Sequence, residues 1–371
     1  MNKKLISLLL SAALAVSMLT VPAFAAEGGE ADAALDETNE VVVTLGDTVT
    51  ASTVEDTDKA AADKTAADKT KTADSAPAAS TEKKQITYVA LGDSIVAGVG
   101  LADVKYAKDS TTLYSVDMSP NFKGYSPDCY VGKVATMMGL DRDHAINLGL
   151  PALTAPDLAD MVRDGQMPKM NMESGCWYKY PEFQDYIRKA DVVSVQIGSN
   201  DAFVPCIVAL GNATNWKSEA LAASVLAGDL RASGSPAAAL IQGIKDMHLT
   251  RDERNATWNL LTSEMGKICD RIYPQTTAGL ISVVQEIRKL NPDCQILLMG
   301  YTDPVPFVPC WHNYFKKLNK FEKQLAETYD LTYVAIPKAK TDLDVHPTIS
   351  GHEYIAKKIV NSIELAEDSA Q

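Results

Sequence analysis

Residues 86–95 read ITYVALGDSI, in which six β-favouring residues, Ile86 to Leu91, run directly into the turn residues Gly92-Asp93-Ser94. A short apolar run that ends in a turn is typical of a strand buried on both faces of a sheet. A Ser just beyond such a strand is exposed in the crevice at the strand's carboxyl end, and its backbone N–H can point at a bound anion. The motif is weak by itself, because Gly, Asp and Ser are common turn residues.

Four further β-rich runs follow along the chain, and helical patterns separate them. The runs are residues 145–148, 192–197, 295–299 and 331–336, and the clearest helical patterns cover residues 277–290, 313–329 and 350–364. The last pattern begins with a capping-box sequence, Ser350-x-x-Glu353. Strands that alternate with helices predict a parallel sheet covered on both faces, and right-handed crossovers favour a doubly wound α/β sheet of about five strands.

Residues 203–276 interrupt that alternation and are too long for a structureless loop in a compact domain. Ser235-Pro236 predicts a helix start, and Thr250-x-x-Glu253 is a second capping-box sequence. We therefore expect a helical insertion after the third strand. Because ligands bind at the carboxyl ends of strands in such folds, the insertion is either a lid over the site or additional core.

The composition limits the class of protein. The 371 residues are 46% hydrophobic and 22% charged, which excludes a wholly disordered, collagen-like or multi-span membrane protein. The formal net charge of −13 does not suit a phosphate backbone, so we expect no nucleic-acid partner. The six cysteines include no CxxC pair, so zinc or thioredoxin chemistry has no support, and free thiols and disulfides both remain open.

The first 25 residues predict a cleaved secretory signal peptide. Lys3 and Lys4 precede an apolar core from Leu5 to Leu19, and a small-x-small site ends at Ala25. No later segment has about 18 consecutive apolar residues, so we expect no integral membrane segment after cleavage. The expected location is extracellular or in the cell envelope.

Residues 26–84 differ in amino-acid composition from the rest of the chain that follows them. They contain no aromatic residue, and residues 61–70 repeat the sequence Ala-Ala-Asp-Lys-Thr. Such a segment cannot bury enough apolar surface to offset the entropy lost on ordering. We expect a disordered, Ala/Thr/Asp/Lys-rich tether here and a globular domain over residues 85–371.

Three later segments add candidate polar groups at strand ends. The second strand leads into residues 147–154, and the third ends in Gly198-Ser199-Asn200-Asp201. The amide of Asn200 has two donors that can face a developing oxyanion. Near the C-terminus the sequence Asp342-Leu343-Asp344-Val345-His346-Pro347 precedes the last helix, and a loop His beside acids can be a general base oriented by a partner.

Taken together, the four segments resemble the conserved blocks of the GDSL, or SGNH, hydrolases. The resemblance runs from about Ile86 to Ala366, apart from the insertion. It implies a flavodoxin-like three-layer α/β/α fold. It also implies that Ser94 is the nucleophile, that His346 is the general base, and that Asn200 and the Ser94 backbone N–H are oxyanion donors. No Gly-x-Ser-x-Gly elbow is present, which argues against the separate α/β-hydrolase fold.

Two positions depart from the pattern of that family. The family's oxyanion Gly falls on Ala152, which can still supply a backbone N–H, and Gly149 is the alternative if the turn is shifted. The family's acid, three residues before the His, falls on Leu343, and Asp344 lies one residue later. We expect Asp344 to orient His346, and the Leu343 carbonyl is the alternative acceptor.

The resemblance implies an exported serine carboxylic-ester hydrolase that acts through an acyl-enzyme, without a cofactor or metal. The substrate would be a small-molecule ester or an ester of a lipid or an acetylated polysaccharide. An apolar lid would favour lipids, and a shallow cleft beside Trp177, Tyr178 or Trp311 would favour sugars. An acyltransferase with the same site and a non-catalytic binding module of the same fold are the alternatives. We expect a monomer, and we expect His352 to pack or cap a helix.

Overall fold

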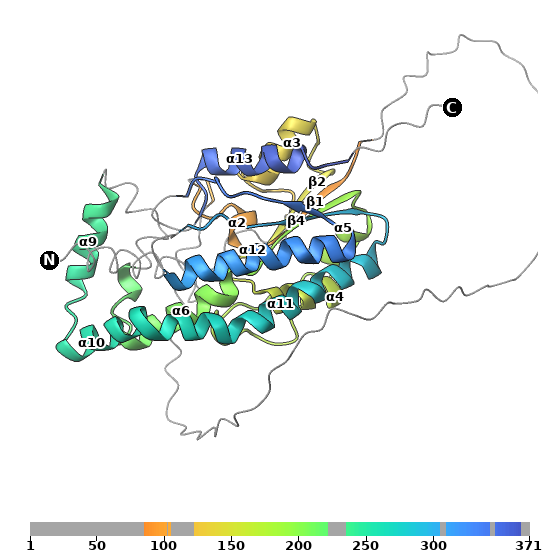
Figure 1. Ribbon diagram of the computed structural model, residues 1–371. Coiled ribbons are helices and arrows are strands. Elements are labelled where there is room, and N and C mark those ends of the chain that lie inside the picture. The colour runs from red at the N-terminus through yellow and green to blue at the C-terminus, as the bar shows by residue number, and fades with distance from the viewer. Residues whose placement is uncertain are drawn as a thin grey trace, which may run out of the picture. The chain divides into compact units, whose positions relative to one another are not determined.

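The computed structural model describes residues 85–101, 103–104, 122–221, 235–304, 309–341 and 346–364 (Figure 1). The predicted signal peptide at 1–25, the predicted tether at 26–84, and the acid candidates Leu343 and Asp344 lie outside the described residues. In the described part of the chain, no helix is both long enough and apolar enough to cross a membrane.

Five parallel strands form a sheet with the order β2-β1-β3-β4-β5, which confirms the predicted strand number and orientation. The strands are β1 (Tyr88–Gly92), β2 (Ala145–Gly149), β3 (Val192–Gln196), β4 (Gln295–Met299) and β5 (Thr332–Val334). Gly92 pairs with both Gly149 and Gln196, so β1, β2 and β3 end at the same level. The strand order reverses at β1, so the ligand crevice expected of such a sheet opens at the carboxyl end of this strand.

Helices cover both faces of the sheet. The helices are α2 (Ser94–Ala97), α3 (Tyr130–Met138), α4 (Ala155–Asp164), α5 (Phe183–Arg188), α6 (Ser199–Ala213), α9 (Pro236–Asp246), α10 (Arg251–Asn259), η1 (Leu260–Glu264), α11 (Met265–Leu290), α12 (Pro309–Tyr329) and α13 (Ile349–Val360). Figure 1 shows α3 and α13 packed together on one face, and α4, α11 and α12 on the other. This arrangement is the predicted flavodoxin-like α/β/α sandwich.

The segment predicted as an insertion, residues 203–276, is continuous with core helices at both ends. It starts inside α6 and ends inside α11, which extends from Met265 to Leu290 even though Pro274 lies within it. Proline usually interrupts a helix, but here the packing of α11 against α4, α6 and α12 holds the helix together. The predicted capping box of Thr250 and Glu253 forms at the start of α10. A lid role for this segment stays a prediction.

The last helix begins two residues earlier than the sequence pattern predicts. Thr348 is the N-cap of α13, and its Oγ1 accepts a hydrogen bond from the Gly351 N–H at 3.1 Å. The predicted capping box of Ser350 and Glu353 is therefore wrong. The backbone N–H of Thr348 also donates to the Lys340 carbonyl at 2.9 Å, which holds the N-cap residue in place.

One carboxyl group is buried in the core without a hydrogen-bond partner among the described residues. Glu322 lies on α12, its side chain has no exposed surface, and neither carboxyl oxygen is hydrogen-bonded there. Burial raises the pKa of Glu322 well above its ordinary value of 4.5, because the protein interior disfavours the charged form. The carboxyl therefore holds its proton at pH values where a surface glutamate is charged.

We expect Glu322→Gln to be more stable than the parent chain at pH 8 by about 1 kcal/mol or more, and the difference to vanish near pH 4. Above pH 4.5 the unfolded chain releases the proton that folded Glu322 retains. The contribution of this group to stability is therefore full below that pH and is lost as the pH rises. Urea unfolding at several pH values measures the effect. Glu327→Gln, at an exposed position of the same helix, is the matched control. A difference that does not change with pH would contradict the assignment.

Candidate active site

The centre of the site is a contact between two residues that are 252 positions apart in the sequence. Ser94 Oγ lies 3.1 Å from His346 Nε2, and His346 is only 2% exposed. Ser94 is the first residue of α2, directly after β1, so the strand end carries it into the crevice. The structure thus brings together the two residues that the sequence predicts as nucleophile and base.

The turn that carries Ser94 requires glycine before it and a carboxylate beside it. Gly92 has a φ of +153°, and an added Cβ would overlap the Gln196 carbonyl oxygen of the neighbouring strand. Asp93 is the N-cap of α2 and accepts a hydrogen bond from the Ile95 N–H at 3.0 Å. The close approach of Gly92 to β3 and the Asp93 cap together fix the start of the short helix α2 at the end of β1.

Asp93 is the centre of a buried hydrogen-bond network that sequence reasoning missed. Its Oδ2 accepts from Ser199 Oγ at 2.7 Å and from Tyr301 Oη at 3.2 Å. Burial raises the pKa of Asp93, while these hydrogen bonds and the nearby His346 oppose that rise. The network joins the ends of β1, β3 and β4 beneath the site. The only sequence signal for Tyr301 is its position just after the fourth predicted strand.

Three candidate oxyanion donors come from the ends of three strands. Among the described residues, the backbone N–H groups of Ser94 and Ala152 make no hydrogen bond. Asn200 lies in the first turn of α6, and its Nδ2 donates to the Leu153 carbonyl at 3.0 Å. That bond uses one amide hydrogen and leaves the second one for a ligand. The Asn200 side chain is thereby fixed to the loop that contains Ala152.

Gly149 does not fit the alternative donor role. Its N–H donates to Asn147 Oδ1 at 2.9 Å, so it is already used within the turn. Asn147 Nδ2 in turn donates to the Val96 carbonyl of α2 at 2.8 Å. An added Cβ on Gly149 would overlap the backbone nitrogen of Ala97, so glycine is required here for the close approach of α2 to β2. This geometry favours Ala152 as the donor from the second strand.

The loop that contains Ala152 is held from two directions. Tyr178 Oη donates to the Pro151 carbonyl at 2.8 Å, and Asp201 Oδ2 accepts from the Ala155 N–H at 2.9 Å. Burial raises the pKa of Asp201 to about 7. Since Asp201 follows Asn200 directly, the same helical turn positions both the loop and the side-chain donor.

The described residues on either side of His346 are held to each other. Thr341 and Pro347 form an isolated antiparallel bridge, next to the bond from Thr348 to Lys340. Gly351 packs so closely on the Lys340 carbonyl that an added Cβ would overlap it. The predicted partner Asp344 lies outside the described residues, so its contact with the His346 ring stays a prediction.

The structure also tests the predictions made for His352 and for the aromatic residues of a sugar-binding cleft. His352 is fully buried, and its Nδ1 accepts from the Tyr130 N–H at 3.2 Å, which confirms a capping role at the start of α3.

Trp311 is also fully buried against Phe203, so the prediction that it could flank a sugar-binding cleft is wrong. Trp177 is 53% exposed. Its neighbour Tyr178 contacts the Ala152 loop, so this part of the predicted cleft remains available.

Ala152 has a φ of +62°, in the left-handed region that favours glycine. We expect Ala152→Gly to keep its activity within a few-fold of the parent, because glycine adopts this backbone conformation without a steric cost. We expect Ala152→Val to lose about 10-fold or more of its activity and about 1–3 kcal/mol of stability, since a β-branched side chain is strained at this φ. Ester hydrolysis and thermal unfolding measure both effects. Equal activity of the two variants would show that the Ala152 backbone does not shape the site.

Comparison with known proteins agrees with the resemblance seen in the sequence. The model of the GDSL-like lipase/acylhydrolase family matches residues 90–354. Similar solved structures include the lipase Lip_vut3 from a goat rumen metagenome, at 14% identity, with 75% of this chain and 97% of that chain covered and a TM-score of 0.42. Phospholipase A1 from Streptomyces albidoflavus NA297 matches at 15% identity, with 75% and 100% covered and a TM-score of 0.38.

A catalytic mutant of an acetylxylan esterase from Geobacillus stearothermophilus is a further similar structure, at 17% identity, with 76% and 95% covered and a TM-score of 0.35. No curated protein matches the chain. The family model extends from β1 into α13 and therefore spans the whole sheet together with Ser94, Asn200 and His346. The chain belongs to the GDSL-like lipase/acylhydrolase family.

Proposed function

We propose that this chain is an exported carboxylic-ester hydrolase in which Ser94 is the nucleophile and His346 is the general base. The observation that carries the proposal is the 3.1 Å contact between Ser94 Oγ and His346 Nε2 at the carboxyl end of β1. A base within hydrogen-bond reach can take the hydroxyl proton while the oxygen attacks an ester carbonyl. Membership in a family of lipases and acylhydrolases supports the ester class of substrate.

The attack places negative charge on the former carbonyl oxygen of the ester. The N–H groups of Ser94 and Ala152 and the second amide hydrogen of Asn200 would stabilise that oxyanion, and each well-aimed donor lowers the barrier by about 3–4 kcal/mol. His346 then gives its proton to the leaving alcohol. Water, activated by His346 in the same way, releases the acid from the acyl-enzyme and restores Ser94.

We propose Asp344 as the residue that orients His346, and we expect Asp344→Asn to lower kcat by about 10³-fold or more. An amide can favour the wrong imidazole tautomer and cannot stabilise the imidazolium. Asp342→Asn, two residues away in the same loop, is the matched control and should retain most of the activity. The kcat values of both variants with p-nitrophenyl acetate show whether Asp344 orients His346. Full activity of Asp344→Asn would favour the Leu343 carbonyl as the acceptor.

Export is supported by the signal-peptide pattern that ends at Ala25 and by the aromatic-free segment that follows it. The proposed location is the extracellular space or the cell envelope. The N-terminal sequence of the secreted protein tests this part of the proposal, and the expected first residue is Ala26. A protein retained in the cell with an intact N-terminus would overturn export and leave the hydrolase assignment unaffected.

Hydrolysis of p-nitrophenyl acetate and p-nitrophenyl octanoate by the mature protein tests the enzymatic proposal. A fluorophosphonate inhibitor tests the nucleophile in the same sample, because it forms a covalent adduct with an activated serine. We expect turnover of at least one ester and a stoichiometric adduct on the peptide that contains Ser94. The absence of both would overturn the proposal. Product analysis with an added alcohol separates the hydrolase from an acyltransferase, and the ratio of the two ester rates separates acetyl from longer acyl groups.

A further inference from the structure

The proposed oxyanion donor Ala152 lies in a four-residue turn that runs from Leu150 to Leu153. The N–H of Leu153 donates to the Leu150 carbonyl at 3.4 Å and closes the turn. Pro151 is the second residue, and its ring fixes φ at about −65°. Ala152 is the third residue, with a φ of +62°. Proline followed by a positive φ is the pattern of a type II turn, because the third residue of the commoner type I turn has a φ of about −90°.

An alanine at the third position does not favour this turn by itself. Types I and II differ in the orientation of the central peptide, which here joins Pro151 to Ala152. Glycine adopts a positive φ without a steric cost, whereas a side chain at this position favours the negative φ of type I. The type II form of a Pro-Ala turn therefore needs support from outside its four residues.

The two ends of the turn are fixed by neighbouring elements. The N–H of Leu150 donates to the Gly92 carbonyl, at the end of β1, at 2.9 Å. The Leu153 carbonyl accepts a hydrogen bond from Asn200 Nδ2 at 3.0 Å. These two bonds hold the first and last residues of the turn. They do not act on the central peptide, so they are compatible with either orientation of it.

Tyr178 acts on the central peptide directly. Its Oη donates to the Pro151 carbonyl at 2.8 Å. Because a trans peptide is planar, its C=O and N–H point in opposite directions. A hydroxyl that holds the Pro151 carbonyl on one side therefore turns the Ala152 N–H to the other side. In a type I turn the same carbonyl would point away from Tyr178, and the bond would be lost.

A hairpin between α4 and α5 presents the Tyr178 side chain to the turn. Gln166 and Lys179 form an antiparallel bridge, and the N–H of Met167 donates to the Tyr178 carbonyl at 2.9 Å. The Tyr178 ring stacks on the ring of Tyr180, with the ring centroids 6.1 Å apart. Main-chain bonds and ring packing thus place this side chain without the help of its hydroxyl. Tyr178→Phe therefore removes the bond to the turn and leaves the hairpin intact.

We propose that Tyr178 is a positioning residue for ester hydrolysis, which holds the type II turn and thereby directs the Ala152 N–H toward the oxyanion. This role rests on the proposed function, in which the Ala152 N–H is one of three oxyanion donors. Glycine at position 152 would favour the turn by itself. With alanine in its place, the Tyr178 hydroxyl supplies that preference.

Tyr178→Phe is expected to lower kcat for p-nitrophenyl acetate by about 10-fold and to leave KM within about two-fold of the parent value. A misdirected donor loses its effect on the charge of the transition state and not on the bound ester. The loss should be smaller than the effect of deleting an oxyanion donor, which is about 10²–10³-fold, because the bond biases the turn and does not itself bind the oxyanion.

The same substitution in an Ala152→Gly background separates positioning from a general loss of stability. Glycine favours the type II turn without the hydroxyl, so Tyr178→Phe should lower kcat there by no more than about three-fold. The difference between the two backgrounds measures the coupling of the two residues, which general destabilisation would not produce. Equal losses of kcat in the two backgrounds would show that the hydroxyl does not act through the turn, and would overturn the proposed role.

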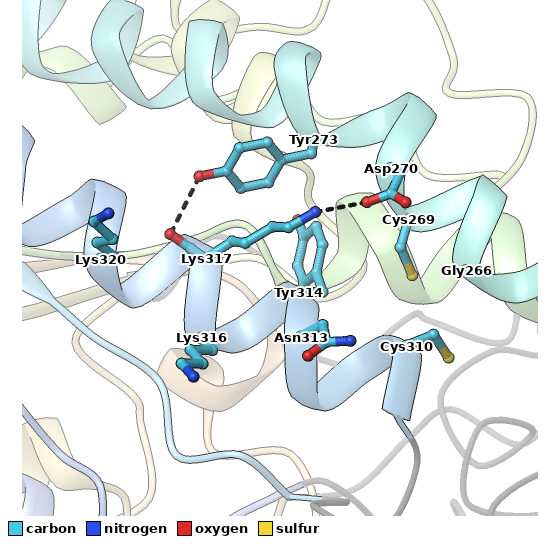
Figure 2. Close-up of a pocket in the computed structure, with 10 residues that line it drawn as sticks. All are labelled: Gly266, Cys269, Asp270, Tyr273, Cys310, Asn313, Tyr314, Lys316, Lys317 and Lys320. Atoms are coloured by element: carbon cyan, nitrogen blue, oxygen red, sulfur yellow. Dashed lines mark hydrogen bonds and ion pairs between the residues drawn. The ribbon is translucent and has the colours of Figure 1, made fainter.

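Tyr273→Phe is the matched control. Figure 2 shows Tyr273 Oη of α11 donating to the Lys317 carbonyl of α12, at 3.1 Å. The bond is of the same kind, from the hydroxyl of a partly buried tyrosine to a backbone carbonyl, but its acceptor belongs to a helix. Tyr273→Phe should keep the parent kcat, and the melting temperatures of the two Phe variants should lie within about 2 °C of each other. An equal loss of kcat in both variants would overturn the role of Tyr178.

The parent chain distinguishes failure of this role from failure of the proposed function. A parent that hydrolyses neither p-nitrophenyl ester and forms no fluorophosphonate adduct would overturn the proposed function, and the role of Tyr178 with it. An active parent whose Tyr178→Phe variant has an unchanged kcat would overturn the role of Tyr178 alone.

Discussion

The Ser94→Ala variant is expected to lose ester hydrolysis by about 10⁴-fold or more while keeping its fold. The Oγ of Ser94 lies 3.1 Å from His346 Nε2 at the carboxyl end of β1, so its removal takes away the proposed nucleophile. The N-cap of α2 is Asp93, so the start of this helix does not depend on the Ser94 hydroxyl. We therefore expect kcat to fall and the melting temperature to stay within about 2 °C of the parent value.

A double-mutant cycle extends this prediction to His346. His346→Ala should lower kcat by a similar factor, and the double variant should be no slower than either single variant, because residues that act as a unit are not additive. His312→Ala, at an exposed histidine paired with Asp303, is the matched control and should be fully active. If the two effects instead multiply in the double variant, Ser94 and His346 do not act on the same step.

The Asn200→Ala variant is expected to lower kcat by about 10²–10³-fold with little change in KM. The second amide hydrogen of Asn200 would bind charge that exists only in the transition state, so its loss raises the barrier without weakening substrate binding. The side chain also donates to the Leu153 carbonyl at 3.0 Å, and we expect a stability loss of about 1 kcal/mol from that bond. Steady-state kinetics and urea unfolding separate the two contributions.

Two further variants sharpen this experiment. Asn212→Ala, at an exposed position of the same helix α6, should change neither kcat nor stability. Asn200→Asp keeps the shape of the side chain but replaces donors with a negative charge, so it should be slower than Asn200→Ala. A large rise in KM with unchanged kcat would place Asn200 in ground-state binding and would remove it from the oxyanion site.

The sequence was sufficient to predict the sheet and the two residues, Ser94 and His346, that the structure brings within 3.1 Å of each other. Predicted strands and helices alternate along the domain apart from residues 203–276, and parallel strands bring their carboxyl ends to one edge. The strand ends placed Ser94 at this edge, and the resemblance to the GDSL hydrolases then implied that Ser94 and His346 are the nucleophile and the base. The sequence leaves two partners for His346 open, because Leu343 stands at the position of the family's acid and Asp344 follows it.

What local sequence could not predict depends on long-range contacts. The Asp93 network needs Tyr301 from the end of β4. The start of α13 is at Thr348, whose side chain caps the helix and whose N–H donates to the Lys340 carbonyl. Each of these features is set by tertiary packing, which overrides the preferences of short segments.

Strands β1, β2 and β3 end at the same level of the sheet, and this affects when activity can first appear during folding. Ser94, Ala152 and Asn200 each follow one of these strands, and His346 arrives only with the loop after β5. A chain that has folded only as far as β3 cannot hold all four, because His346 follows β5 and must reach a partner 252 positions upstream. We therefore expect ester hydrolysis to begin only when the domain has folded completely. In a refolding experiment the circular dichroism of the sheet and helices should recover before the first product is released.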